Sequence, residues 1–203
     1  MGKSLILFLR NSVGLVFKPY ITYREISVSQ KGYQQVFFIH FLVLIYFLAS
    51  SVLKTGLRNP FLLTLKFNSL YFSAYIGFFL MIGLLYLCAK LIRLKDYSVN
   101  KLILLWSYSL WPTLCWFFFT SLLYLLLPPP RSLTYLGKTY SLLYLVSSLT
   151  ILFWKIILYY LTLRFGLRLE LFRILLLSSI IFPSIAVFSI IMYRLSIFKI
   201  PFL

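Results

Sequence analysis

The chain contains 203 residues, of which 62% are hydrophobic and 11% are charged, and its mean hydropathy is +0.98. Soluble domains are about half apolar, so this composition excludes an ordinary water-soluble fold. The net charge of +17, from twenty Lys and Arg against three acidic residues, indicates an anionic partner, either nucleic acid or a membrane surface. Because the basic residues stand singly or in small groups between long apolar runs, we expect anionic lipid headgroups and no nucleic acid.

The first predicted unit, residues 1–32, contains an amphipathic segment. One face of a helix over this segment carries Lys3, Arg10, Gly14 and Lys18. Another face carries Ile6, Leu9, Val13 and Phe17. This pattern predicts a short helix that lies in the membrane surface and ends before Pro19. The alternative is a frayed apolar terminus.

Five apolar runs of about 20 residues follow, the length that a membrane-spanning helix needs. The predicted spans are 33–53, 67–89, 102–127, 140–163 and 174–193. Backbone amides in hydrocarbon must bond within the segment, and the runs lack the alternation of a membrane β-barrel. The sequence therefore predicts an all-α, polytopic transmembrane helix bundle over 33–193, with a short C-terminal tail over 194–203.

The basic flanks of the spans predict the orientation. About twelve basic residues fall beside the N-terminus and in the second and fourth connections, against about seven on the other side. The positive-inside rule then places the N-terminus in the cytoplasm and the C-terminus outside. The candidate contacts to anionic headgroups on the cytoplasmic face are Lys3, Arg10, Lys18, Arg24, Lys90, Arg93, Arg164, Arg168 and Arg173.

Residues that could carry catalysis or bind metal are scarce. The acids Glu25, Asp96 and Glu170 stand on three different segments outside the spans, and His40 is the only histidine. These four residues provide no carboxylate pair at membrane depth and no His-rich metal site. The sequence also contains no glycine-rich phosphate-binding loop. We therefore predict no enzyme activity, no catalytic residue, no metal and no cofactor. A Ser/His pair that uses His40 stays open, beside an interfacial hydrogen bond.

Lys155 and two prolines are the candidate intramembrane polar and kink sites. Lys155 stands next to Trp154 near the middle of the fourth span, where a lysine costs about 2.5–3.5 kcal/mol. It could form a polar site for a headgroup or a transported anion, or it could snorkel toward the interface. Pro112 and Pro183 each free a backbone carbonyl, and the resulting kinks either line a cavity or improve packing.

Small residues recur at four-residue spacing in the second span, at Ser69, Ser73 and Gly77. Side chains of this size let a second helix approach closely. The pattern predicts a packing seam, used within the chain, with a partner membrane protein or in a homo-oligomer.

Three motifs follow one another along the chain. The first is FKPYITYREISVSQKGYQQ from Phe17, the second is WSYSLWPTL, and the third is Trp154 followed by FGLRLELFR. In this order they resemble the Yip1-domain family of five-helix integral membrane proteins. The resembling positions are Pro19, Thr22, Tyr23, Arg24, Glu25, Ile26, Tyr108, Ser109 and Pro112. The resemblance covers about residues 15–193.

The resemblance implies five spans and no catalytic activity. Since the long polar tail of eukaryotic relatives is missing before the motifs, it implies a prokaryotic cytoplasmic (inner) membrane. The first functional hypothesis is thus a non-enzymatic Yip1-like membrane protein that organises membrane or docks a partner complex. The alternative is a small permease-like transport subunit for a lipid or apolar solute, whose path would be lined by Lys155, Pro112 and Pro183.

Overall fold

The computed structural model describes residues 2–29, 33–55, 59–94, 97–126 and 135–197. Within these ranges the regular structure is entirely helical, which confirms the predicted all-α class. Five helical segments are long and apolar enough to cross a membrane, as the sequence predicts. Residues 198–203 of the predicted tail and most of the predicted connection after the third span lie outside the described ranges.

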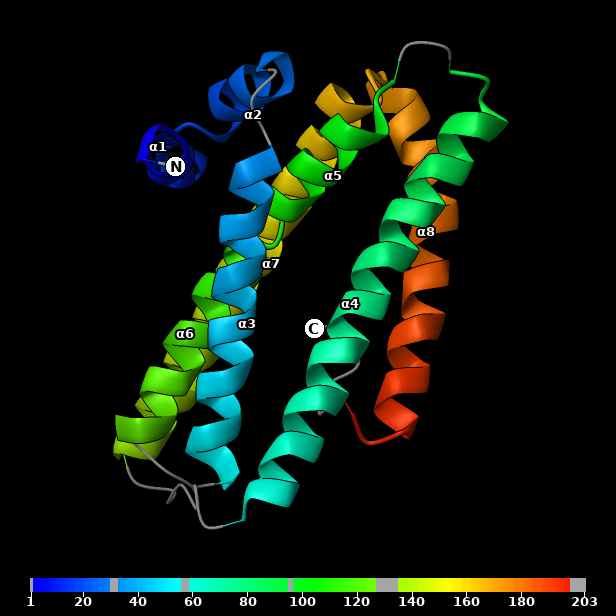
Figure 1. Ribbon diagram of the computed structural model, residues 1–203. Helices are drawn as coiled ribbons and strands as arrows, with labels where there is room; N and C mark the ends of the chain where they lie inside the picture. Colours follow the sequence, from blue (N-terminus) through cyan, green and yellow to red (C-terminus); the bar gives the residue numbers. More distant parts are fainter. Residues whose placement is uncertain (1, 30–32, 56–58, 95–96, 127–134, 198–203) are drawn as a thin grey trace.

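Two short helices precede the spanning bundle, α1 (Gly2–Phe17) and α2 (Pro19–Val28). Figure 1 shows α1 nearly end-on while the long helices run along the page, so α1 lies across one end of the bundle. Pro19 is the first residue of α2, where its missing N–H costs nothing. The predicted helix and its end before Pro19 are therefore confirmed, whereas its place in a membrane surface stays a prediction.

The long helices are α3 (Tyr33–Thr55), α4 (Pro60–Leu91), α7 (Tyr135–Gly166) and α8 (Leu171–Arg194), while the third span divides into α5 (Val99–Tyr108) and α6 (Trp111–Leu126). α4 begins seven residues before the predicted residue 67. Asn59 explains this start, because its Oδ1 accepts a hydrogen bond from the Leu62 N–H at 3.3 Å and Pro60 follows it. Lys66 bounds the predicted apolar run, but the helix continues past it to the Asn59 cap.

The break in the third span follows from Pro112. Proline has no N–H to bond the carbonyl four residues earlier, that of Tyr108, so the helix cannot continue regularly. Leu110 instead donates its N–H to the Ser107 carbonyl at 3.1 Å, and the Ser109 hydroxyl donates to the Trp106 carbonyl at 2.7 Å. Pro183, by contrast, lies exposed inside a continuous α8.

Two apolar clusters hold the bundle together, and α5 belongs to both. Met81, Leu85 and Leu163 lie in the cluster that joins α4, α5, α7 and α8. Leu15 and Tyr23 lie in the other cluster, which packs α1 and α2 onto α3, α5, α6 and α7. The short helices are therefore part of the folded bundle rather than appendages to it.

The predicted small-residue seam packs α4 against α8 at its last member. Ser73 is buried, Ser69 is half-buried, and a Cβ placed on Gly77 would lie 3.0 Å from Phe188 Cε1 on α8. A Cβ on Gly83 of the same helix would meet nothing within 4 Å. Gly77 therefore permits a close approach of the two helices, and Gly83 does not serve this purpose.

We expect Gly77→Leu to lower the free energy of unfolding by about 1–3 kcal/mol, because the new side chain must displace the Phe188 ring. Gly83→Leu is the matched control, and its larger helix propensity should leave stability unchanged or slightly raised. Thermal unfolding of both variants in the same detergent measures the difference. Equal behaviour of the two variants would contradict the seam.

Candidate functional site

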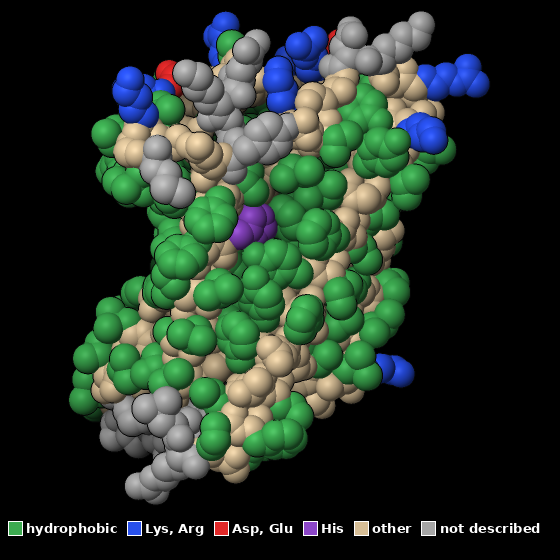
Figure 2. Space-filling view, in the orientation of Figure 1, with side chains coloured by type: hydrophobic (Ala, Val, Ile, Leu, Met, Phe, Trp, Pro, Cys, Tyr) green, Lys and Arg blue, Asp and Glu red, His purple; other side chains and the backbone are tan. Residues whose placement is uncertain are grey.

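Basic side chains gather at the end of the bundle across which α1 and α2 lie (Figure 2). All nine predicted headgroup contacts belong to this end, and all nine are exposed. Lys101, on the first turn of α5, is a tenth basic residue there. The described basic residues toward the opposite end are Lys66, Lys138 and Arg194. Lys31, Arg58, Lys95, Arg131, Lys199 and the side chain of Lys54 lie outside the described residues.

Few acidic groups offset this charge. Glu25 lies 3.4 Å from the Arg10 guanidinium, and both side chains are more than half exposed, so the pair contributes at most about 1 kcal/mol. Glu170 is exposed before α8, and Asp96 lies outside the described residues. The basic end therefore keeps a strong excess of positive charge.

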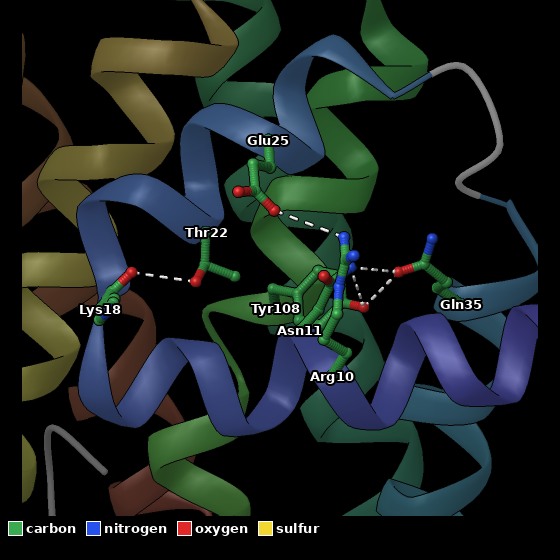
Figure 3. Close-up of polar contacts among 7 residues, drawn as sticks. All are labelled: Arg10, Asn11, Lys18, Thr22, Glu25, Gln35 and Tyr108. Atoms are coloured by element: carbon green, nitrogen blue, oxygen red, sulfur yellow. Dashed lines mark hydrogen bonds and ion pairs between the residues drawn. The ribbon is translucent and has the colours of Figure 1, made fainter.

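A buried polar cluster attaches α1 to the bundle (Figure 3). Asn11 of α1 donates its amide N–H to Gln35 Oε1 of α3 at 2.8 Å, and the Tyr108 hydroxyl of α5 donates to the same oxygen. A third contact, of 3.4 Å, joins Asn11 Nδ2 to the Tyr108 hydroxyl. All three residues are buried, so these hydrogen bonds are required to satisfy polar groups that have left water.

The α1–α2 turn is built on a close contact at Gly14. A Cβ on Gly14 would overlap the Thr22 hydroxyl, which donates to the Lys18 carbonyl at 2.9 Å. Tyr23 is fully buried and donates its hydroxyl to the Leu105 carbonyl of α5 at 3.1 Å. Burial raises the pKa of the Tyr23 hydroxyl far above its usual value, so this side chain stays a neutral donor. The motif at Pro19 to Ile26 thus serves to dock α2.

A basic cleft of about 570 Å³ opens between α2, the start of α5 and the end of α7. Four cations line it, Arg24, Lys101, Arg164 and Arg168, together with the hydroxyl residues Ser27, Tyr97 and Ser98. Three of these cations are predicted headgroup contacts. The cleft itself could not be foreseen, because its walls come from three separate segments of the sequence.

His40 lies within the bundle, where it forms hydrogen bonds that the sequence does not reveal. Its Nδ1 is 3.1 Å from the Tyr75 hydroxyl of α4, and its Nε2 is 3.3 Å from Ser107 Oγ of α5. Ser107 also donates its hydroxyl proton to the Ile103 carbonyl at 2.8 Å, so this hydroxyl is engaged within its own helix. His40 therefore links α3 to α4 and α5.

Access to this trio is also unfavourable for catalysis. Ser107 is fully buried, so a substrate could not reach its hydroxyl. An apolar cavity of about 80 Å³ lies beside His40 and Tyr75, lined further by Phe78, Thr113 and Phe117. This volume corresponds to two or three water molecules, given roughly 30 Å³ for each.

Lys155, Pro112 and Pro183 do not come together around this cavity. Lys155 and Trp154 are half-buried on α7, and the Trp154 indole N–H is buried without a hydrogen-bond partner among the described residues. Pro112 is buried at the α5–α6 break, whereas Pro183 is exposed on α8. In the described part of the chain no hydrogen bond or ion pair of Lys155 occurs, and no group of three His, Cys, Asp or Glu side chains is placed to hold a metal ion.

The helical fold and the distribution of charge place this chain in the class of polytopic α-helical integral membrane proteins. No protein-family model, curated protein or solved structure matches the chain. The resemblance to Yip1-domain proteins therefore remains a prediction based on the three sequence motifs.

Proposed function

We propose that this chain is a non-enzymatic, Yip1-like protein of a prokaryotic cytoplasmic membrane that organises anionic lipid, or docks a partner complex, at its basic end. The N-terminus lies in the cytoplasm and the C-terminus outside. The observation that supports this best is the concentration of ten exposed or half-buried basic residues at the end where α1 and α2 lie. Each such base near an anionic leaflet contributes about 1 kcal/mol of attraction.

The exposed side chains of α1 also support a membrane-surface role. Ile6, Leu9, Val13 and Phe17 are each more than half exposed, while Phe8 and Leu15 pack on the bundle. This apolar face is free to contact the acyl chains just below the lipid headgroups. Lys3, Arg10 and Lys18 lie exposed beside it, where they can contact the headgroups themselves. α7 likewise exposes apolar side chains to lipid, or to a membrane-protein partner or second copy.

The alternative, a small permease-like transport subunit for a lipid or apolar solute, has weaker support. Its proposed path needs Lys155, Pro112 and Pro183 along one cavity, and the cavity beside His40 is lined by none of them. At about 80 Å³ this cavity is also far smaller than the roughly 300 Å³ of typical ligand pockets.

Lipid selectivity tests the proposal. The protein is reconstituted in vesicles of phosphatidylcholine with a spin-labelled anionic or zwitterionic lipid, and the motionally restricted fraction of each label is compared. We expect the anionic lipid to be enriched about fivefold at low salt, since about 1 kcal/mol corresponds to this factor, and less at 0.5 M salt because exposed charges are screened. Equal restricted fractions for both lipids at low salt would contradict the proposal.

A further inference from the structure

The basic cleft between α2, α5 and α7 brings together four cations from four separate positions of the chain. Arg24 comes from α2, Lys101 from the first turn of α5, Arg164 from the last turn of α7, and Arg168 from the α7–α8 connection. The described residues that line the cleft include no acid. Like charges around one cleft repel one another, and a bound anion would offset this repulsion.

None of these four cations forms an ion pair among the described residues. Glu25, the nearest acid along α2, contacts Arg10 instead. Arg164 uses one guanidinium nitrogen to donate to the Leu169 carbonyl at 2.9 Å, which leaves its other donors available. Among the described residues that line the cleft, the arrangement therefore provides donors for an anion and no carboxylate that would neutralise them.

The start of α5 adds to the same positive field. Ser98 precedes α5, but its side chain accepts no hydrogen bond from the first turn of the helix. The first-turn N–H groups and the positive end of the helix dipole consequently lack a side-chain cap at the wall of the cleft. A bound phosphate would supply the missing acceptor, as phosphates do at other helix N-termini.

Arg168 occupies a backbone conformation that is unfavourable for any side chain. Its φ of 54° lies in the left-handed region, where glycine is the usual residue at a helix end. The neighbouring Leu167 and Leu169 are buried, so the connection is fixed by its packing. The chain thus has an arginine at position 168, beside the cleft, although glycine would adopt this positive φ with less strain.

We propose that this cleft binds the phosphate group of an anionic lipid headgroup, a proposal that rests on the function given above. The cleft lies at the end of the spanning helices, where the phosphates of the cytoplasmic leaflet are located. Its volume of about 570 Å³ accommodates a phosphate with its attached glycerol. The exposed basic residues elsewhere at this end attract anionic lipid in general, and the cleft selects one phosphate in a defined site.

Binding of short-chain lipids tests the cleft directly. Dioctanoyl phosphatidic acid, dioctanoyl phosphatidylcholine and inorganic phosphate are each titrated into the full-length protein in an uncharged detergent, with calorimetry as the readout. We expect phosphatidic acid to bind at least about tenfold more tightly than phosphatidylcholine. The double variant Arg24→Gln with Lys101→Gln should lose about tenfold to a hundredfold of this affinity, since each position removes a charged donor.

The matched control is Lys90→Gln with Arg173→Gln, which removes one Lys and one Arg from exposed positions at the same end but outside the cleft. It should change the affinity less than about threefold, and unchanged thermal transitions verify that both double variants fold. Equal losses for the two double variants would overturn the cleft while leaving general anionic-lipid attraction intact. Absence of any preference for phosphatidic acid in the unmodified protein would also overturn it. A further outcome is that inorganic phosphate binds as tightly as phosphatidic acid and loses this affinity in the cleft double variant. That result would support the phosphate site and identify its ligand as soluble phosphate rather than lipid.

Discussion

Replacing Gln35 with Leu is expected to lower the free energy of unfolding by about 2–4 kcal/mol and to release α1 from the bundle. Gln35 Oε1 accepts hydrogen bonds from both Asn11 and Tyr108, and the variant removes this acceptor, which leaves the two buried donors only the longer Asn11–Tyr108 contact of 3.4 Å. Each buried unsatisfied group costs about 1–3 kcal/mol. Thermal unfolding in detergent measures the stability, and hydrogen exchange over residues 2–17 reports whether α1 is released.

Gln34→Leu provides the control for this experiment. Gln34 is the same residue type one position earlier, and its side chain is exposed, where it accepts from the Ser4 hydroxyl. We expect a change within about 0.5 kcal/mol, as for other surface substitutions. If both variants lost stability equally, the buried cluster would not be what holds α1.

A triple variant sharpens the interpretation of the cluster. Asn11→Leu, Gln35→Leu and Tyr108→Phe together remove both donors along with the acceptor, so none of the three hydrogen bonds of the cluster leaves an orphaned partner. Replacing all partners by apolar groups is close to neutral in many proteins, so the triple variant should recover most of the stability lost by Gln35→Leu. A triple variant less stable than Gln35→Leu would mean that packing, rather than hydrogen bonding, dominates at this site.

Lys155→Leu is expected to stabilise the protein by up to about 2.5–3.5 kcal/mol, the cost of a lysine at the centre of a spanning helix. Lys155 stands eleven residues before the end of α7 at Gly166, or about 16 Å along the helix at 1.5 Å per residue. No hydrogen bond or ion pair within the described residues offsets this cost. Thermal unfolding of the variant in a lipid nanodisc provides the measurement.

The control for Lys155 is Lys138→Leu, which removes the same charge from an exposed position near the other end of α7. Its stability should change little, because that end lies in the polar interface. A destabilised Lys155→Leu variant would instead reveal a required polar contact of this ammonium group. That result would revive the transport path on which the permease hypothesis depends.

The spanning helices could be predicted because the bilayer imposes a length and an apolar composition that a single segment displays by itself. The same rule makes the predicted spans for α4 and α7 too short, because Lys66 and Lys138 bound the apolar runs without ending the helices. Pro112 was a foreseeable kink. The complete break after Tyr108 depends on how the freed backbone groups are satisfied, which composition does not specify.

The candidate sites were only partly predictable, for a related reason. The exposure of the nine predicted headgroup contacts could be predicted, because charge at a helix end favours exposure at each position by itself. The Asn11–Gln35–Tyr108 cluster and the Tyr75–His40–Ser107 chain depend on contacts between positions 24 to 97 residues apart. One signal was present for the first cluster, since Asn11 is an amide within an apolar helix and Gln35 begins a span. The pairing of these two residues needed the folded structure.

Labelling of single cysteines tests the central claim, that the basic end of a five-span bundle faces the cytoplasm. Cys88 and Cys115 are first replaced by Ala, and a membrane-impermeant maleimide is then applied to intact and to permeabilised cells. We predict that cysteines at Lys18, Lys90 and Arg173 react only after permeabilisation, whereas cysteines at Lys66, Lys138 and Arg194 react in intact cells. If some positions of each group reacted in intact cells, the result would contradict both the five-span bundle and its orientation.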